Sequence, residues 1–287
     1  VRELSNMTSF RVMPKHVYEG KDTVTDEEAR ITCGPYVLES FNKESGTITF
    51  VVNEKYPQQP NVEKIVYQLF GNEDTMYLAL QQGDIDMVWA YSAGVAGTYQ
   101  DVLAGDANVS LINVAAANAP AVLAFNNAKG LFSNEDLRQA VSYALDYDAF
   151  KTYFGSAYAE IPNRGFVPAT TVGYKETEKL TTDASKADEY MKAAGYAEKN
   201  ADGFFVNADG QVAAFTLTVN AAKEAHVGYA EMVKTQLESF GIQVNLDTVD
   251  KDAYNAKTSN KFSENNITME AAIYGYTAAG MGMGNGL

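Results

Sequence analysis

The stretch AVLAFNNAKGLFSNEDLRQAVSYALDYDAF, residues 121–150, contains the clearest succession of secondary-structure signals in the chain. Its apolar start, residues 121–125, predicts a strand, and a polar break follows at Asn126 and Asn127. Ser133 then suits a helix N-cap, because its hydroxyl can accept a hydrogen bond from an orphan N–H of the first turn. Apolar residues follow at the spacing of one helix face, namely Leu137, Ala140, Val141, Ala144 and Leu145. The stretch therefore predicts a strand, a break and a helix, as at a crossover between domains.

Strand and helix signals alternate on both sides of this stretch. Before it, residues 36–40 and 47–52 predict a hairpin, and residues 85–89 predict a short buried strand. After it the predicted order is strand, helix, strand, helix, strand, in residues 215–219, 222–240, 242–246, 251–258 and 269–276. This order predicts an α/β fold with mixed sheets flanked by helices. We expect two lobes: residues 1–125 form a portion of a discontinuous first lobe, and residues 126–287 form a second lobe truncated at its C-terminal end.

Composition narrows the class of function. A hydrophobic share of 46% with 21% charged residues is typical of a globular protein and excludes general disorder. The net charge of −15 argues against nucleic acid or an anionic membrane surface as the main partner. Cys33 is the single cysteine, which excludes an internal disulfide and a cysteine-rich metal site. His16 and His226 lie 210 positions apart without metal-ligand spacing, so we predict neither a metal nor a cofactor.

Two acidic patterns admit a catalytic or metal-binding interpretation and a plainer one. Asp84 and Asp86 would share one face of a strand, yet a helix-ending turn followed by a solvent-facing strand edge explains them more simply than an acid/base pair. The repeated Asn-Ala-Asp-Gly of residues 200–203 and 207–210 lacks the remaining ligands of a calcium loop and indicates hairpin turns. No nucleophile elbow, phosphate loop or dinucleotide fingerprint occurs. We therefore predict a protein that is not an enzyme.

Aromatic and small residues gather where predicted strands end. Trp89 and Tyr91 follow one strand, and the segment from Tyr274 to Met281 ends another. Ligand sites of open α/β sheets lie outside the carboxyl ends of strands, and aromatic walls beside glycine suit a mid-sized solute. The alternative is that these aromatics belong to the core and that the glycines only form turns.

Several segments of the chain are similar to segments found, in the same order along the chain, in members of one protein family. These are FNN…LFSNEDLRQAVSYALD from residue 125, CGPY at 33–36, NEKY at 53–56, GDIDM at 83–87, AAGY at 193–196 and GIQV at 241–244. They resemble the extracytoplasmic solute-binding proteins of ABC importers, in the oligopeptide-, dipeptide- and nickel-binding family 5. The resemblance covers nearly the whole chain. It implies a two-lobed periplasmic-binding-protein fold of type II with an extra domain.

The resemblance also implies a function and partners. A monomer would capture a peptide or other small solute between its lobes and deliver it to a membrane permease and its ATPase. It would work outside the cytoplasm, in the periplasm or on the cell surface as a lipid-anchored protein. We expect the signal and anchor to lie outside this chain, because the chain opens without methionine and family members are longer at both ends.

The implied cleft gives the expected ligand-binding residues. They are Trp89, Tyr91, Asn126, Tyr274, Gly275, Tyr276, Thr277 and Ala279. Family members that hold a free α-amino group carry an aspartate where this chain has Ala279. A buried ammonium without a carboxylate is costly. Either another part of the protein holds the amine, or the solute is not an ordinary free peptide.

Two other classes of function stay open at this point. One is a secreted α/β hydrolase that acts on peptides or glycans, with catalytic groups contributed across segments. The other is a sensor or adhesion module built on the same binding fold.

Overall fold

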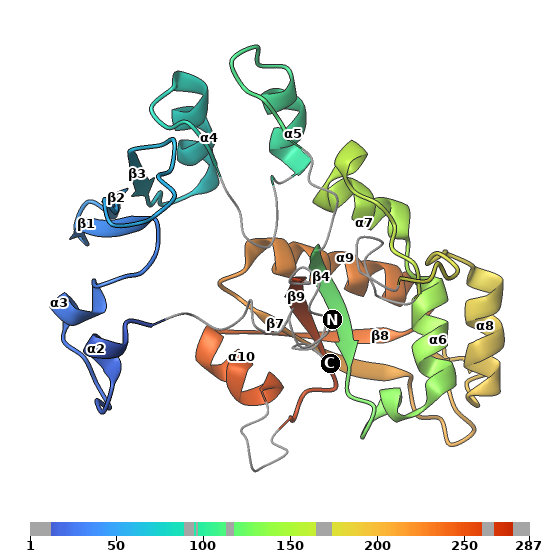
Figure 1. Ribbon diagram of the computed structural model, residues 1–287. Coiled ribbons are helices and arrows are strands. Elements are labelled where there is room, and N and C mark those ends of the chain that lie inside the picture. Colours follow the sequence, from blue (N-terminus) through green and yellow to red (C-terminus); the bar gives the residue numbers. More distant parts are fainter. Residues whose placement is uncertain are drawn as a thin grey trace. The chain divides into compact units, whose positions relative to one another are not determined.

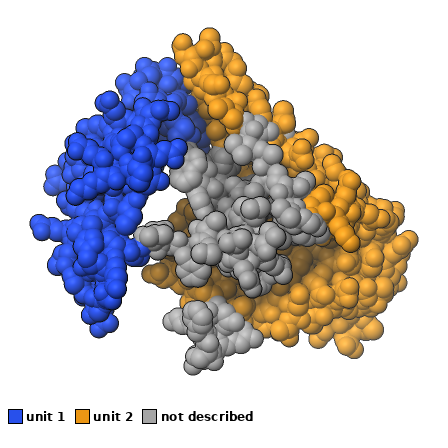
Figure 2. Space-filling view, viewed as in Figure 1, with its two compact units in different colours: residues 1–88 blue, residues 89–287 orange. Residues whose placement is uncertain are grey.

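A computed structural model describes residues 13–88, 95, 97–112, 118–164, 174–259 and 267–277, with side chains for all of these except 118–120, 156, 276 and 277 (Figure 1). The chain divides into two compact units, Val1–Val88 and Trp89–Leu287 (Figure 2). The lobe boundary expected near residue 125 stays a prediction.

The first unit contains a three-stranded antiparallel sheet. Its strands β1 (Tyr36–Asn42), β2 (Thr47–Val52) and β3 (Lys64–Gln68) lie in that order, and the predicted hairpin is confirmed. Helix α4 (Glu73–Gln82) follows and ends at Gly83, whose φ of 78° is a conformation that favours glycine.

Short helices precede this sheet. One is α2 (Lys15–Tyr18), and the other is α3 (Asp26–Ala29). A capping box forms α3: the Thr25 side chain accepts from Glu28 N, and the Glu28 carboxylate accepts from Thr25 N. This reciprocal pair explains the short helix.

The sequence predicted a buried strand at residues 85–89. For residues 85–88, which the structure describes, this prediction is wrong. These residues form no strand, and the Met87 side chain is 73% exposed. An apolar run becomes a strand only when another strand takes up its backbone hydrogen bonds, and the described residues pair no strand with this one. Asp84 and Asp86 are both exposed and do not share a strand face. Residues 109–112 form no strand either.

The second unit is an α/β structure around a four-stranded sheet in the order β4-β9-β7-β8. Its elements are α5 (Gly97–Ala104), β4 (Asn118–Phe125), η1 (Leu131–Ser133), α6 (Glu135–Ala144), α7 (Tyr147–Phe154), η2 (Ser156–Tyr158), α8 (Ala184–Ala193), β5 (Glu198–Lys199), β6 (Phe205–Val206), β7 (Ala214–Asn220), α9 (Glu224–Phe240), β8 (Gln243–Val249), α10 (Lys251–Thr258) and β9 (Ala271–Thr277). Strand β7 runs parallel to β8 and β9, whereas β4 is antiparallel to β9. The predicted strand-helix order and the α/β fold class are confirmed.

One face of this sheet packs against helices to form the main core. The strands contribute Phe215, Leu217, Val219, Val244, Ala271 and Ile273. The helices α6, α8 and α9 contribute Leu137, Ala140, Val141, Met191, Ala230, Val233 and Leu237. Alternate strand residues point to the opposite face, where Ala272 packs with Tyr254 of α10 and Met269. The sheet therefore has helices on both faces.

Helix α6 begins one residue later than the sequence predicted. Asn134 is the N-cap, and its Oδ1 accepts from Asp136 N at 2.8 Å. Ser133 belongs to η1, and its hydroxyl donates to Gly130 O at 2.8 Å. Serine and asparagine cap helices about equally well, so local sequence did not separate the two. The predicted apolar face is confirmed, with Leu137, Ala140, Val141 and Leu145 buried.

Two buried tyrosines predict alkaline instability. Burial raises the pKa of Tyr229 and of Tyr254 well above the ordinary value of 10.0. Above that pH the unfolded chain releases protons that the folded chain retains, so the free energy of unfolding falls as pH rises. We expect urea unfolding to show this decline from about pH 10 upward, and Tyr229→Phe to make it shallower. A decline as steep in Tyr229→Phe as in the wild type would contradict the assignment.

Candidate functional site

The parallel strands of the second unit end at one edge of their sheet. Because β7 runs parallel to β8 and β9, their last residues, Asn220, Val249 and Thr277, lie toward the same edge. The antiparallel strand β4 starts there, with Asn118 opposite Thr277. We call this the carboxyl edge. In open α/β sheets it is the edge at which ligands bind.

Strand β9 extends beyond its parallel neighbour at this edge. The ladder between β7 and β9 pairs Leu217 with Ala271 and Thr218 with Ala272. Continuing that register places Tyr274 level with Asn220, the last residue of β7. The remaining three residues of β9 project about 10 Å further. Of these, Tyr276 and Thr277 pair with β4 on the other side of the strand. The end of β9 therefore presents strand backbone that β7 does not cover.

Helix α10 fixes the start of this projecting segment. The Tyr274 hydroxyl donates to Thr258 O at 3.1 Å, and its ring lies 5.9 Å from that of Tyr254. Burial raises the pKa of Tyr274. Gly275, the next residue, is exposed. Tyr274 thus holds the strand against α10, while the backbone at Gly275 stays accessible.

The structure places some of the expected ligand-binding residues together. Tyr274, Gly275, Tyr276 and Thr277 form the last part of β9 at the carboxyl edge. Three other expected residues, Trp89, Tyr91 and Ala279, lie outside the described residues.

Asn126 lies at the other end of the same strand pair. Its backbone N donates to Glu270 O at 2.8 Å, and its Nδ2 donates to Met269 O at 3.0 Å. Glu270 is six residues before Tyr276, a separation of about 20 Å along a strand. The Asn126 amide therefore joins β4 to the segment before β9, far from the projecting end of β9.

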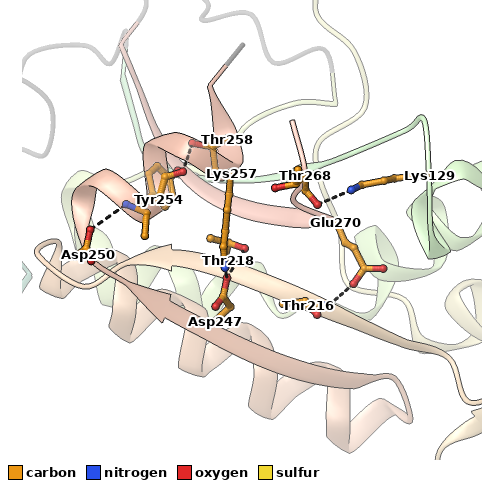
Figure 3. A network of polar contacts seen from close by, with 11 residues as sticks. Lys129, Thr216, Thr218, Asp247, Asp250, Tyr254, Lys257, Thr258, Thr268 and Glu270 are labelled. Carbon is orange, nitrogen blue, oxygen red and sulfur yellow. Dashed lines mark hydrogen bonds and ion pairs between the residues drawn. The ribbon is translucent and has the colours of Figure 1, made fainter. Parts of the chain in front are cut away.

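Sequence reasoning missed a polar network beside the sheet (Figure 3). The Asp247 carboxylate accepts from the Thr218 hydroxyl at 3.1 Å and forms an ion pair with Lys257. Thr218 is only 1% exposed. These contacts join β7, β8 and α10, and so help to position the helix that holds Tyr274. One local signal for this network was available in β8. Val244 and Leu246 lie on one face of the strand, so the side chain of Asp247 must lie on the opposite face.

A second group of contacts in Figure 3 surrounds the start of β9. Glu270 Oε2 accepts from Thr216 N at 2.8 Å, and the Lys129 ammonium donates to Thr268 O at 2.5 Å. The segment that precedes β9 is thereby tied both to β7 and to the residues that follow β4. Sequence patterns gave no signal for these contacts, because their partners lie far apart in the chain.

A hollow of about 490 Å³ lies elsewhere in the second unit. Its lining includes Gly130, Leu137, Tyr196 and Ala214. Ala214 is the first residue of β7, so this hollow lies toward the amino ends of the parallel strands. Ligands of such sheets bind at the opposite edge, and we do not assign the hollow to the solute.

The acidic and histidine residues were the candidates for a metal site. Within the described ranges, no group of three or more His, Cys, Asp or Glu side chains is placed to hold a metal ion. The two Asn-Ala-Asp-Gly repeats are turns: Gly203 and Gly210 have φ of 86° and 76°, and the Asn200 and Asn207 side chains accept from backbone N–H groups within each turn. The hairpin-turn interpretation is confirmed.

Among the described residues, no helix combines the length and the apolar composition needed to cross a bilayer.

Sequence comparison finds relatives among binding proteins. The chain is 29% identical over 158 residues to a probable D,D-dipeptide-binding periplasmic protein of Escherichia coli, covering 54% of this chain and 29% of the relative. It is 24% identical over 261 residues to heme-binding protein A of Haemophilus influenzae, covering 90% and 43%. It is 22% identical over 259 residues to the nickel-binding periplasmic protein of Escherichia coli, covering 86% and 47%. The chain thus spans less than half the length of these relatives.

Solved structures share the fold. The oligopeptide-binding protein AppA of Bacillus subtilis, in complex with a nonapeptide, superimposes with a TM-score of 0.67 at 22% identity, over 92% of this chain and 52% of that one. NikA of Brucella suis, in complex with Fe(III)-EDTA, gives a TM-score of 0.73 at 18% identity, over 90% and 51%. A periplasmic oligopeptide-binding protein of Thermotoga maritima gives 0.74 at 17% identity, over 95% and 52%. The expected periplasmic-binding-protein fold is confirmed.

The family profile decides membership. Residues 3–280 match the profile described as bacterial extracellular solute-binding proteins, family 5 middle. This match covers nearly the whole chain and agrees with both the relatives and the shared fold. The chain belongs to the family 5 bacterial extracellular solute-binding proteins.

Proposed function

We propose that this protein captures a peptide or peptide-like solute for an ABC importer and delivers it to the membrane permease and ATPase. It acts outside the cytoplasm as a monomer. Residues 1–125 contribute to one lobe and residues 126–287 to the other, and the solute binds in the cleft between these lobes. The observation that carries the proposal is the projecting end of β9 at the carboxyl edge, in a chain of this family.

The projecting end of β9 suits a peptide main chain. The ladder with β7 ends at Ala272, so the later β9 residues have N–H and C=O groups that β7 does not take up. An extended peptide binds such an edge through main-chain hydrogen bonds, and neighbouring side chains then select its residues. The aromatic residues Trp89, Tyr91 and Tyr276 would supply walls for those side chains, with Gly275 giving backbone access.

The names of the relatives support a peptide without requiring one. Some bind peptides by name, including the D,D-dipeptide-binding relative and the nonapeptide complex. Others bind heme, nickel or Fe(III)-EDTA. Because Ala279 offers no carboxylate for a free α-amino group, we propose a solute whose amine is blocked or is held by another part of the protein. Binding proceeds by closure of the lobes and makes or breaks no covalent bond.

The direct test is mass spectrometry of small molecules released from gently purified protein. Peptides or modified peptides in near-stoichiometric amount would support the proposal. A metal chelate, a heme or a sugar in their place would overturn the peptide assignment while leaving the fold intact. A turnover assay with mixed peptides and glycosides completes the test, since hydrolysis would contradict a purely binding role.

Loss of either aromatic wall should weaken binding. We expect Trp89→Ala and Tyr276→Ala each to cost about 1–3 kcal/mol of binding free energy, as expected when a buried aromatic contact is removed. The measurement is calorimetric titration with the solute identified by mass spectrometry. Tyr158→Ala, at an exposed ring of the second unit, should bind like the wild type. Unchanged affinity in both aromatic variants would contradict the assignment of Trp89 and Tyr276 to the binding site.

A further inference from the structure

Arg164 stands in a loop segment whose backbone is fixed independently of its side chain. Its N–H donates to Glu178 O at 2.8 Å, and Leu180 N donates to Pro162 O at 3.0 Å. Between these bonds, Asn163 forms an antiparallel bridge with Lys179. Two short segments therefore clasp one another and hold the Arg164 Cα in place.

The guanidinium of Arg164 lies on helix α6. Its Cζ is 4.2 Å from the centroid of the Tyr143 ring, and its Nη1 donates to Ser142 Oγ at 3.2 Å. Tyr143 is buried and its ring stacks at 5.8 Å on Tyr190 of α8. Stacking fixes the plane of the guanidinium, and the Ser142 bond fixes its rotation within that plane.

The other two nitrogens of this guanidinium are buried without a hydrogen-bond partner in the described part of the chain. They are Nε and Nη2. Arginine keeps its charge at any ordinary pH, and buried charged donors in native proteins are nearly always paired. No ion pair of Arg164 with a carboxylate occurs among the residues that the structure describes. The two donors call for an anionic acceptor.

Guanidinium geometry specifies the kind of acceptor. Nε and Nη2 lie on the same edge of the planar group, so their N–H bonds point in nearly the same direction. The two oxygens of one carboxylate match this edge and accept two parallel hydrogen bonds. Nη1, which lies away from this edge, is the nitrogen already used by Ser142. The edge of the guanidinium that matches a carboxylate therefore has no hydrogen-bond partner among the described residues.

The surroundings favour an anion and present polar groups. A second cation, Lys186 Nζ, lies 5.1 Å from the centroid of the same Tyr143 ring. The Tyr147 hydroxyl donates to Ser142 O at 2.7 Å and lies 3.3 Å from Ser142 Oγ. Burial raises the pKa of Tyr147, although the charge of Arg164 acts to lower it. A neutral tyrosine and two cations form a setting in which negative charge is stabilised.

We propose that Arg164 binds the carboxylate of a solute through Nε and Nη2, with Ser142 and Tyr143 holding the guanidinium in register. All contacts that define this carboxylate site lie in the second unit. Evidence against this site would therefore not contradict the cleft proposed above, and evidence against the cleft would not contradict this site.

Nitrogen-15 NMR of the arginine side chains tests the site directly. The chain has five arginines, so selective labelling gives at most five Nε–H signals, and Arg164→Lys identifies the one from Arg164. We expect sodium acetate to move that signal downfield saturably, while sodium chloride at equal ionic strength leaves it in place. Acetate binding, followed by line broadening of carbon-13-labelled acetate, should weaken about tenfold or more in Arg164→Lys, because lysine cannot form two parallel bonds to one carboxylate.

Arg138→Lys is the matched control. Arg138 Nη1 donates to the backbone carbonyl of Phe132 at 2.7 Å, so this arginine already has a hydrogen-bond acceptor within the chain. Its replacement should leave the acetate response of the Arg164 signal unchanged. The wild-type titration needs no variant to fold, which keeps the test decisive if Arg164→Lys is unstable.

Three results would overturn the proposal. The first is an Arg164 signal that acetate does not move in folded protein. The second is an equal response to chloride or sulfate, which would mean a general anion contact. The third is a signal already shifted downfield in acetate-free buffer and insensitive to acetate, which would mean that a carboxylate of the chain itself occupies the edge.

Discussion

Replacing Phe132 by alanine should lower the free energy of unfolding of the second unit by about 3–5 kcal/mol, the range measured for large-to-small changes of buried aromatic residues. Phe132 is fully buried, and its ring centroid lies 4.1 Å from that of Phe125 and 4.7 Å from that of Phe215. The three rings join β4, η1 and β7. Alanine would leave a cavity and remove both ring contacts, which add to the loss of buried area.

Urea unfolding followed by far-UV circular dichroism measures this change, and amide hydrogen exchange in β7 assigns it to the second unit. Two compact units need not unfold together, so the exchange data are the more specific readout. The matched control is Phe41→Ala, at a ring that is 58% exposed, which should cost less than about 1 kcal/mol. Similar costs for the two variants would contradict the placement of Phe132 in the core.

The Gly130→Ala variant should lower the free energy of unfolding by about 2–4 kcal/mol, because it adds backbone strain and removes a hydrogen bond. Gly130 has φ 65° and ψ −155°, a combination that glycine alone adopts readily. A Cβ at this position would lie 2.8 Å from Glu270 Oε1. Glu270 cannot swing away freely, because its Oε2 accepts from Thr216 N at 2.8 Å. The new methyl group would therefore strain the turn before α6 and detach Glu270 from β7.

Gly203→Ala is the matched control for this variant. Gly203 also has a positive φ, 86°, but a Cβ there would meet nothing within 4 Å. This variant should lower the free energy of unfolding by only about 1–2 kcal/mol, the cost of a residue with a side chain in the left-handed region. In the double variant Gly130→Ala, Glu270→Ala, the total should fall short of the sum of the single changes, because the contact between the two sites is gone. Additive costs, measured by urea unfolding, would show that Gly130 and Glu270 do not interact.

Much of the local structure was predictable from neighbouring residues. Asp146 caps α7 and Asp183 caps α8, each through its side-chain carboxylate. The hairpin of β1 and β2 and the glycine end of α4 follow from equally local signals. Capping, turn chemistry and the spacing of apolar residues act within a few positions of the chain, so the sequence displays them directly.

The errors arose where local signals were ambiguous or a partner was missing. Ser133 and Asn134 are both competent caps, and in the structure Ser133 belongs to η1 whereas Asn134 caps α6. Residues 85–88 have a strand-like composition but no neighbouring strand in the described structure. The candidate site was half predictable: the run from Tyr274 to Thr277 was expected at a strand end and lies at one, whereas Asn126 belongs to the opposite end of the strand pair.

By itself, then, the sequence determined the succession of strands and helices, the buried face of α6 and the likeness to a solute-binding family. Only the tertiary structure decided that β4 lies antiparallel beside β9, some 150 positions later, that β9 projects past β7, and that the Arg164 guanidinium lies on Tyr143 with two donors unpaired. The reason is physical. Helix and turn formation depend on interactions within a few residues, whereas the neighbour of a strand or a guanidinium depends on which distant surfaces are buried together.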